Sequence, residues 1–196
     1  CKSSVFRRGL RLFSRDYFNN DFNGDWCMTS ILKVSEIQDP TNSNSALTID
    51  SSGRVLTPAR PAWSAYRTGG AAAQTTQNAY VTCPWNATSI NDGNFNTSTY
   101  AYTTPVAGLY HINYNMRIDD ANSGLYIIAN IAFNGTSAAN SEAYVIESNE
   151  GQYHSMTFSG IFELSASVAI TNQMFVAGDT SWDFEAYGQF SGYLVG

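Results

Sequence analysis

Strict alternation of apolar and polar side chains over residues 110–118 constrains the fold of this chain more than any other feature. The apolar positions are Tyr110, Ile112, Tyr114, Met116 and Ile118. This is the period of a β-strand with one face in a core and the other in water. Residues 125–133 follow a turn rich in Asp, Asn and Gly, and they are apolar on nearly both faces. Such a strand is either central in a sheet or covered by another chain.

Short strands separated by turn residues continue from residue 59 to the C-terminus. We expect them over residues 61–66, 80–85, 99–102, 110–118, 125–133, 156–164, 174–177, 182–186 and 190–195. Asn134-Gly135 predicts a two-residue hairpin turn, since both positions tolerate positive φ. Roughly nine or ten short strands with no helical stretch predict an all-β sandwich or jelly roll. The aromatic residues close to the C-terminus predict that this end of the chain is held in a sheet.

The first 58 residues differ from this pattern. Residues 1–27 carry a basic excess, unlike the acidic remainder, and form an N-terminal extension that either is native or precedes a natural start at Met28. Residues 28–58 predict an attachment or shaft segment. In it, Leu47, Ile49 and Val55 flank an Asp-Ser-Ser-Gly turn, which is typical of a small hairpin. A lone hairpin is unstable in water, so this segment must pack on the head, on a second copy or on a larger particle.

Composition excludes several classes of partner. The net charge is −6 and the pI is about 4.7, whereas nucleic-acid binding needs a basic surface. No run of apolar residues is long enough to predict a membrane span. The three cysteines are far apart and predict neither a disulfide framework nor a metal site. We therefore expect free thiols and a soluble protein made in a cytoplasm.

Candidate chemistry is sparse. No motif of a serine hydrolase, zinc protease or phosphate-binding loop occurs, and the polar strand face around His111 favours a surface histidine over a general base. We expect no enzyme activity, no catalytic residue, no cofactor and no metal. An acidic turn could offer oxygen atoms to a cation such as calcium, although an ordinary Asx turn explains it as well. Aromatic rings near strand ends could stack on a sugar or pack on a neighbouring subunit. The candidate binding residues are Asp119, Asp120, Asn122, Trp182 and Tyr187.

Four motifs in one order resemble the C1q/TNF-like jelly roll. They are Pro61-Ala62-Trp63-Ser64-Ala65, Asn94-Phe95 to Tyr102, Pro105-x-x-Gly108-x-Tyr110 and Phe190-Ser191-Gly192-Tyr193-Leu194. The resemblance covers residues 59–196, as a head of about ten strands. Residues 165–168 depart from it, because the family usually has a Gly-Asp pair there. The resemblance implies a homotrimer. The expected interface residues are Leu125, Tyr126, Ile127, Ile128, Ile131 and Phe133.

A second resemblance concerns the beginning of the chain. Residues 28–34 and 49–55 are similar to the opening segments of marine bacteriophage virion proteins. This implies a structural virion protein, made in the host cytoplasm, whose trimeric fibre or spike head contacts a glycan or protein of the host cell surface. Residues 28–58 would then bind other virion proteins. A capsid decoration protein without a receptor role and a secreted C1q-like lectin remain the alternatives, and an enzyme ranks last.

Overall fold

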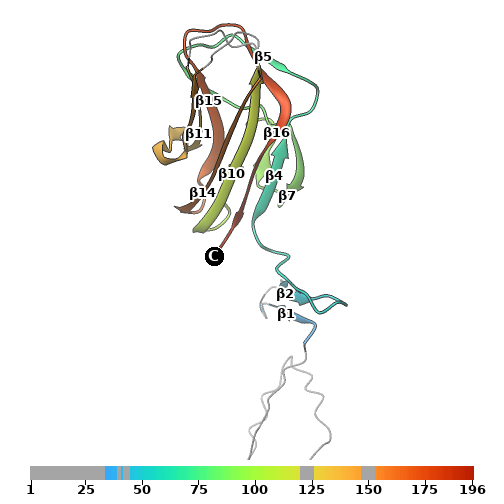
Figure 1. Ribbon diagram of the computed structural model, residues 1–196. Helices are drawn as coiled ribbons and strands as arrows, with labels where there is room; N and C mark the ends of the chain where they lie inside the picture. The colour runs from blue at the N-terminus through green and yellow to red at the C-terminus, as the bar shows by residue number, and fades with distance from the viewer. Residues whose placement is uncertain (1–33, 39–40, 42–44, 120–125, 147–152) are drawn as a thin grey trace, which may run out of the picture. The chain divides into compact units, whose positions relative to one another are not determined.

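The computed structural model describes residues 34–38, 41, 45–119, 126–146 and 153–196 (Figure 1). Within these ranges the regular structure is β, apart from the single 3-10 turn η1 (Ala139–Ser141). The all-β class predicted from the sequence is therefore confirmed. None of the described residues form a helix long and apolar enough to cross a membrane.

One layer of the head is a six-stranded antiparallel sheet. Its strand order is β14-β10-β16-β4-β7, and β5 pairs with β16 beside this path. The strands are β4 (Ala62–Tyr66), β5 (Ala72–Gln74), β7 (Ala87–Asn91), β10 (Gly108–Asp119), β14 (His154–Leu164) and β16 (Trp182–Leu194). The long strand β10 lies between β14 and β16, and Figure 1 shows these three running side by side.

The second layer is a seven-stranded sheet of mostly shorter strands. Its order is β12-β11-β15-β9-β8, while β13 pairs with β11 and β6 pairs with β15. The strands are β6 (Tyr80–Thr82), β8 (Phe95–Asn96), β9 (Ala101–Thr103), β11 (Tyr126–Phe133), β12 (Thr136–Ser137), β13 (Ala143–Ile146) and β15 (Ala169–Val176). Asn134 and Gly135 have φ of 50° and 81° between β11 and β12, which confirms the predicted hairpin turn.

The core fills the space between the two sheets. The five alternating apolar side chains between Tyr110 and Ile118 of β10 point into it and are at most 1% exposed, as their alternation predicted. Trp63 of β4 stacks on Tyr102 of β9, with ring centroids 3.9 Å apart, so these two aromatic residues join the sheets. The buried hydroxyl of Tyr114 donates to the carbonyl oxygens of Ala129 at 2.8 Å and Ser141 at 3.0 Å. The two layers are thus joined by ring packing and by buried hydrogen bonds.

The strand boundaries differ from the sequence prediction in several places. Strands β5, β7 and β13 lie outside the predicted strands, and residues 182–186 and 190–195 belong mostly to one continuous strand, β16. Gly188 lies in the predicted gap between these two segments, but the chain does not turn there. Instead, the ladder between β10 and β16 is irregular here, and a Cβ at Gly188 would lie 2.4 Å from the carbonyl oxygen of Asn115. The glycine allows close approach of two backbones and does not end the strand.

The segment before the head contains the predicted hairpin. Strands β1 (Glu36–Gln38), β2 (Ser45–Ile49) and β3 (Val55–Leu56) form a small antiparallel sheet. The Asp50 carboxylate accepts hydrogen bonds from the backbone N–H groups of Ser52 and Arg54, both at 2.9 Å, which fixes the turn. Apolar side chains of this small sheet remain exposed, namely Ile37, Ile49, Val55 and Leu56. The domain boundaries predicted at residues 27 and 58 stay predictions.

The C-terminus is held in the sheet, as predicted. The N–H of Leu109 donates to the carbonyl of Gly196 at 2.8 Å, and the N–H of Leu194 donates to Pro61 at 2.9 Å. The Arg60 guanidinium donates to the carbonyl of Leu194 and, at 2.8 Å, to that of Val195. We call this end of the head, with Arg60 and the C-terminus, its base. The opposite end, where β10 ends at Asp119 and β16 begins at Trp182, is the distal end (Figure 1).

Candidate binding surfaces

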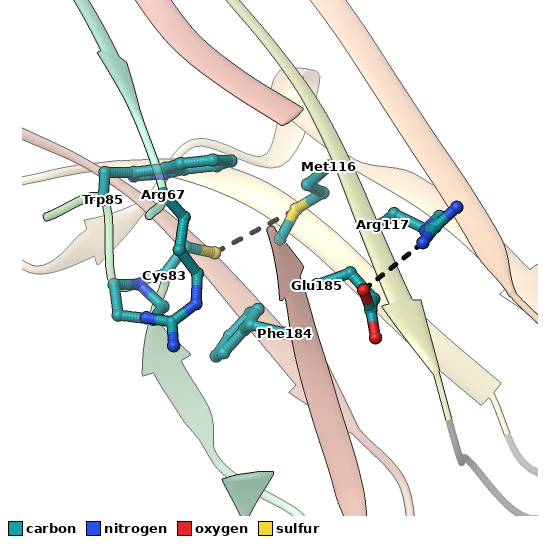
Figure 2. A pocket seen from close by; sticks show the side chains of 8 residues that line it. Arg67, Cys83, Trp85, Met116, Arg117, Phe184 and Glu185 are labelled. Atoms are coloured by element: carbon teal, nitrogen blue, oxygen red, sulfur yellow. Dashed lines mark hydrogen bonds and ion pairs between the residues drawn. The ribbon is translucent and has the colours of Figure 1, made fainter. Parts of the chain in front are cut away.

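A small hollow lies in the distal half of the six-stranded sheet. Figure 2 shows the side chains that line it, which include Cys83 and Met116 with their sulfur atoms 4.0 Å apart. Cys83 is buried and free, and burial raises the pKa of its thiol well above the ordinary value. The hollow measures about 10 Å³, which is room for one water molecule at most. It is too small for an organic ligand.

Beside the hollow, Arg117 is enclosed between two tyrosines on the outer face of the sheet. Its Cζ lies 4.0 Å from the ring centroid of Tyr153 and 4.1 Å from that of Tyr187. One Nη donates to a carboxylate oxygen of Glu185 at 3.3 Å (Figure 2). Asp119 is close as well, since its carboxylate is the first cause of the raised pKa of Tyr153, followed by Glu185. A guanidinium with both faces on rings is rigidly placed.

A row of four aromatic side chains crosses the outer face of the seven-stranded sheet, each from a neighbouring strand. We call Tyr80, Phe175, Tyr126 and Tyr144 the aromatic row. The ring centroids are 5.5 Å apart for Tyr80 and Phe175, and 5.7 Å apart for both Phe175–Tyr126 and Tyr126–Tyr144. The last two pairs are nearly parallel, with interplanar angles of 12° and 23°. The three tyrosines are exposed, Tyr144 at the end of the row by 59%, whereas Phe175 is half-buried.

One end of the aromatic row is anchored by polar neighbours. The Tyr80 side chain interacts with Glu142, Asn130 and Ser137, and its pKa is raised by burial and next by the Glu142 carboxylate. Asn130 belongs to the outer face of β11 yet has no exposed surface. The four strands that carry the row contain no Asp, Glu, Lys or Arg. The four strands are therefore aromatic and amide-bearing without charge, and Glu142 is a charged neighbour at the Tyr80 end.

The outer face of the six-stranded sheet is polar and also uncharged along its centre. Strands β14, β10 and β16 place three rows of side chains in register: Ile161–His111–Tyr193, Ser159–Asn113–Ser191 and Thr157–Asn115–Gln189. His111 Nε2 lies 2.8 Å from Ser159 Oγ, and its ring centroid lies 5.2 Å from that of Tyr193. We call these three rows the central face. Depletion of charge is a mark of the core of protein interfaces.

Strand β14 ends the six-stranded sheet on one side. It has 11 residues and contains neither lysine nor proline, the residues that commonly protect sheet edges. Ile161 on this strand is 58% exposed. A long edge of this kind pairs or packs with another chain unless something covers it.

The predicted binding residues divide between three outcomes. Asp119 and Tyr187 do meet, through Arg117 and Tyr153 at the distal end. Asp120 and Asn122 lie outside the described residues. Trp182 was predicted to stack on a sugar or to pack on a neighbouring subunit, but it is 1% exposed and its Nε1 donates to the Thr76 carbonyl at 3.0 Å, so it belongs to the core. No group of three His, Cys, Asp or Glu side chains within the described ranges could hold a metal ion.

The predicted subunit interface on β11 is partly wrong. Ile127 and Ile131 have no exposed surface, because they point between the two sheets of one subunit and cannot contact another. Phe133 also packs against the core, with its ring 5.1 Å from that of Phe162. Tyr126 and Ile128 do lie on the outer face, where Tyr126 joins the aromatic row. Leu125 lies outside the described residues. The strand is apolar on both faces chiefly because it is central in its own sheet.

Sequence reasoning missed most of the exposed aromatic residues now seen at the distal end. Tyr80 was assigned only to a strand, Tyr144 lay in a segment with no predicted strand, and Tyr153 lay beside an expected turn. The weak alternation of residues 143–146 was the only signal for β13. Pairing between neighbouring strands brings these rings together, and pairing is not written in any single segment.

Comparison with known proteins bears on the fold alone. No protein-family model and no curated protein matches the chain. The solved structure of the TNF protein Eiger from S. frugiperda is similar, with 7% identity and a TM-score of 0.52, over 70% of this chain and 93% of that one. The globular domain of zebrafish complement 1qA has 14% identity and a TM-score of 0.49, over 69% and 98%. With the two-sheet architecture, the likeness to Eiger confirms the predicted C1q/TNF-like jelly roll.

Proposed function

We propose that this chain is a structural and binding protein without enzyme activity, whose jelly-roll head forms a homotrimer. The observation that carries the proposal is the central face, which is uncharged in a chain of net charge −6. Leaving Ile161 and Tyr193 in water beside a β14 edge that carries neither lysine nor proline invites association. Packing the central face and the β14 edge of each copy against its neighbours covers both features and closes into a ring.

The segment before the head serves as the attachment region in this proposal. The small sheet β1–β3 keeps Ile37, Val55 and Leu56 exposed, so it has apolar surface available for a larger particle. The resemblance of residues 28–34 and 49–55 to phage virion proteins supports a virion as that particle. The chain is then a fibre or spike protein whose distal end is free to meet the host cell surface.

Contact with the host is made by the exposed tyrosines of the distal half. Tyrosine offers a large contact area with a polar tip and loses little conformational freedom on binding, which is why it is enriched in binding surfaces. Three heads on each fibre, and many fibres on each particle, multiply weak contacts into firm adhesion. No deep pocket is needed for this mode of binding.

Electron microscopy of particles labelled with an antibody against the full chain tests the proposed location. Label at fibre or spike tips is the expected result. Label spread over the capsid shell would replace the receptor-binding role by that of a decoration protein. Particles that carry no label would contradict the virion assignment altogether. The trimeric state of the head is tested separately, by the mass of the protein in solution.

A further inference from the structure

We infer that the aromatic row on the seven-stranded sheet is a binding site for a linear, uncharged carbohydrate chain. The inference rests on the proposed function, because it names the ligand class that the distal half of the head contacts. The row faces away from the interior and lies on the sheet opposite to the proposed subunit interface. It therefore remains accessible in a trimer built on the central face.

The shape of the row suits a linear polymer. Its four rings follow one line across β6, β15, β11 and β13, with successive centroids 5.5 to 5.7 Å apart. A standard protein interface covers about 800 Å² on each partner. The row is one ring wide, which is narrow for such an interface. A chain of sugar units can lie along it, with its apolar C–H groups against the exposed edges of the rings.

The polar groups around the row match hydroxyl groups. Gln173 and Thr82 are opposite each other on β15 and β6 and are part-exposed, next to Tyr80. Their amide and hydroxyl groups can both donate and accept, as a sugar hydroxyl can. The tyrosine hydroxyls add further donors and acceptors along the row.

Charge selects against acidic sugars. The strands of the row have no Lys or Arg to pair with a carboxylate or sulfate, and Glu142, a charged neighbour among the described residues, is an anion itself. A sialylated or sulfated chain would be repelled and would lose water without gaining an ion pair. Neutral glycans avoid both costs.

The row is also ready for binding before the ligand arrives. Tyr126 is held between Phe175 and Tyr144 by two near-parallel ring contacts. Tyr80 packs against Phe175 at the other end, with ring centroids 5.5 Å apart, and the Glu142 carboxylate lies near its hydroxyl. A ligand therefore does not have to immobilise these side chains, which lowers the entropic cost of binding.

The test uses the full chain and a panel of neutral gluco-, galacto- and manno-oligosaccharides, with sialylated and sulfated chains as charged probes. We expect at least one neutral chain to bind, and Tyr144→Ser and Tyr126→Ser each to weaken it at least tenfold in calorimetric titration. Tyr144→Phe should keep most of the affinity because it keeps the ring. Tyr66→Ser is the matched control, since Tyr66 is 37% exposed and Tyr126 is 39% exposed.

The inference is overturned if no neutral chain binds, if only charged chains bind, or if neither row variant changes the affinity. Light scattering on the same samples separates this failure from that of the proposed function. A trimer without glycan binding overturns only the site, and it would leave the row as a candidate protein contact. Because Tyr144 is 59% exposed, its variants should fold, and Tyr126→Ser provides the second, independent reading.

Discussion

Glycine residues set how closely β16 approaches its neighbours in this head. A Cβ at Gly192 would lie 2.3 Å from Cη2 of Trp63 and 2.7 Å from the backbone oxygen of His111. A Cβ at Gly160 would lie 2.5 Å from Cζ of the Phe158 ring, and that ring can turn away. The two glycines thus have similar sequence contexts in strands but different tolerance to substitution.

Gly192→Ala should lower the free energy of unfolding by about 1–3 kcal/mol, since the β10 backbone and the Trp63 ring must both shift. Gly160→Ala serves as the comparison and should cost less, because only a side chain has to move. Urea denaturation of both variants measures the difference. Equal losses, or a larger loss at Gly160, would contradict this view of the packing.

Buried tyrosine hydroxyls make the head sensitive to alkali. The Tyr102 hydroxyl donates to the Asp92 carboxylate at 2.7 Å, and burial, followed by this hydrogen bond, holds its pKa well above the ordinary 10.0. Burial also raises the pKa of Tyr114. Above pH 10 the unfolded chain releases protons that the folded chain retains, so stability must fall as the pH rises.

The expected unfolding free energy is therefore steady near pH 8 and declines above about pH 10, by up to about 1.4 kcal/mol per pH unit for each such group. Tyr102→Phe should make the decline shallower while costing about 1 kcal/mol at neutral pH through the lost hydrogen bond. Denaturation series at several pH values check both effects. An unchanged slope in the variant would show that Tyr102 is not responsible.

At the scale of elements, the sequence predicts long strands well and short ones poorly. The period of residues 110–118 is sufficient for β10, because one face is buried over its whole length. Strands β5, β7 and β13 have only three to five residues, too few to show a period. Gly188 misled the prediction because a glycine needed for close packing looks the same in sequence as one needed for a turn.

The base of the head depends on a side chain that no strand pattern identifies. Arg60 donates to the carbonyls of Leu194 and Val195, and its Cζ lies 5.3 Å from the Tyr193 ring. These contacts tie the chain entering the head to the last residues of β16. They explain why the C-terminal residues stay in the sheet.

Arg60→Ala should cost about 1 kcal/mol of stability and speed hydrogen exchange of the Leu194 and Val195 amides, because the strand end is freed. Arg67→Ala is the matched control, since Arg67 donates to the carbonyl of Gly70, three residues away, at 2.9 Å and not to the C-terminal strand. Hydrogen exchange monitored by mass spectrometry on the C-terminal peptide distinguishes the two. Unaltered hydrogen exchange in Arg60→Ala would contradict the role of Arg60 in holding the C-terminal residues in the sheet.

At the scale of the whole molecule, the two sheets present different outer faces. The six-stranded sheet offers the central face and the β14 edge, while the seven-stranded sheet offers the aromatic row. The sequence predicted an apolar surface for association but placed it on β11. A single strand that is apolar on both faces cannot reveal whether its second face meets a neighbouring strand's side chains or another subunit, because that depends on long-range pairing.

The mass of the full chain in solution tests the central claim most directly. We predict three times the 21.4 kDa of one chain by multi-angle light scattering. Ile161→Glu would bury a charge in the interface and should reduce the measured mass to that of a single chain. Ile146→Glu, on the other sheet, should leave the mass unchanged. The two isoleucines are a matched pair, because they are 58% and 61% exposed. A monomeric wild-type chain, or a trimer that persists in Ile161→Glu, would contradict the account.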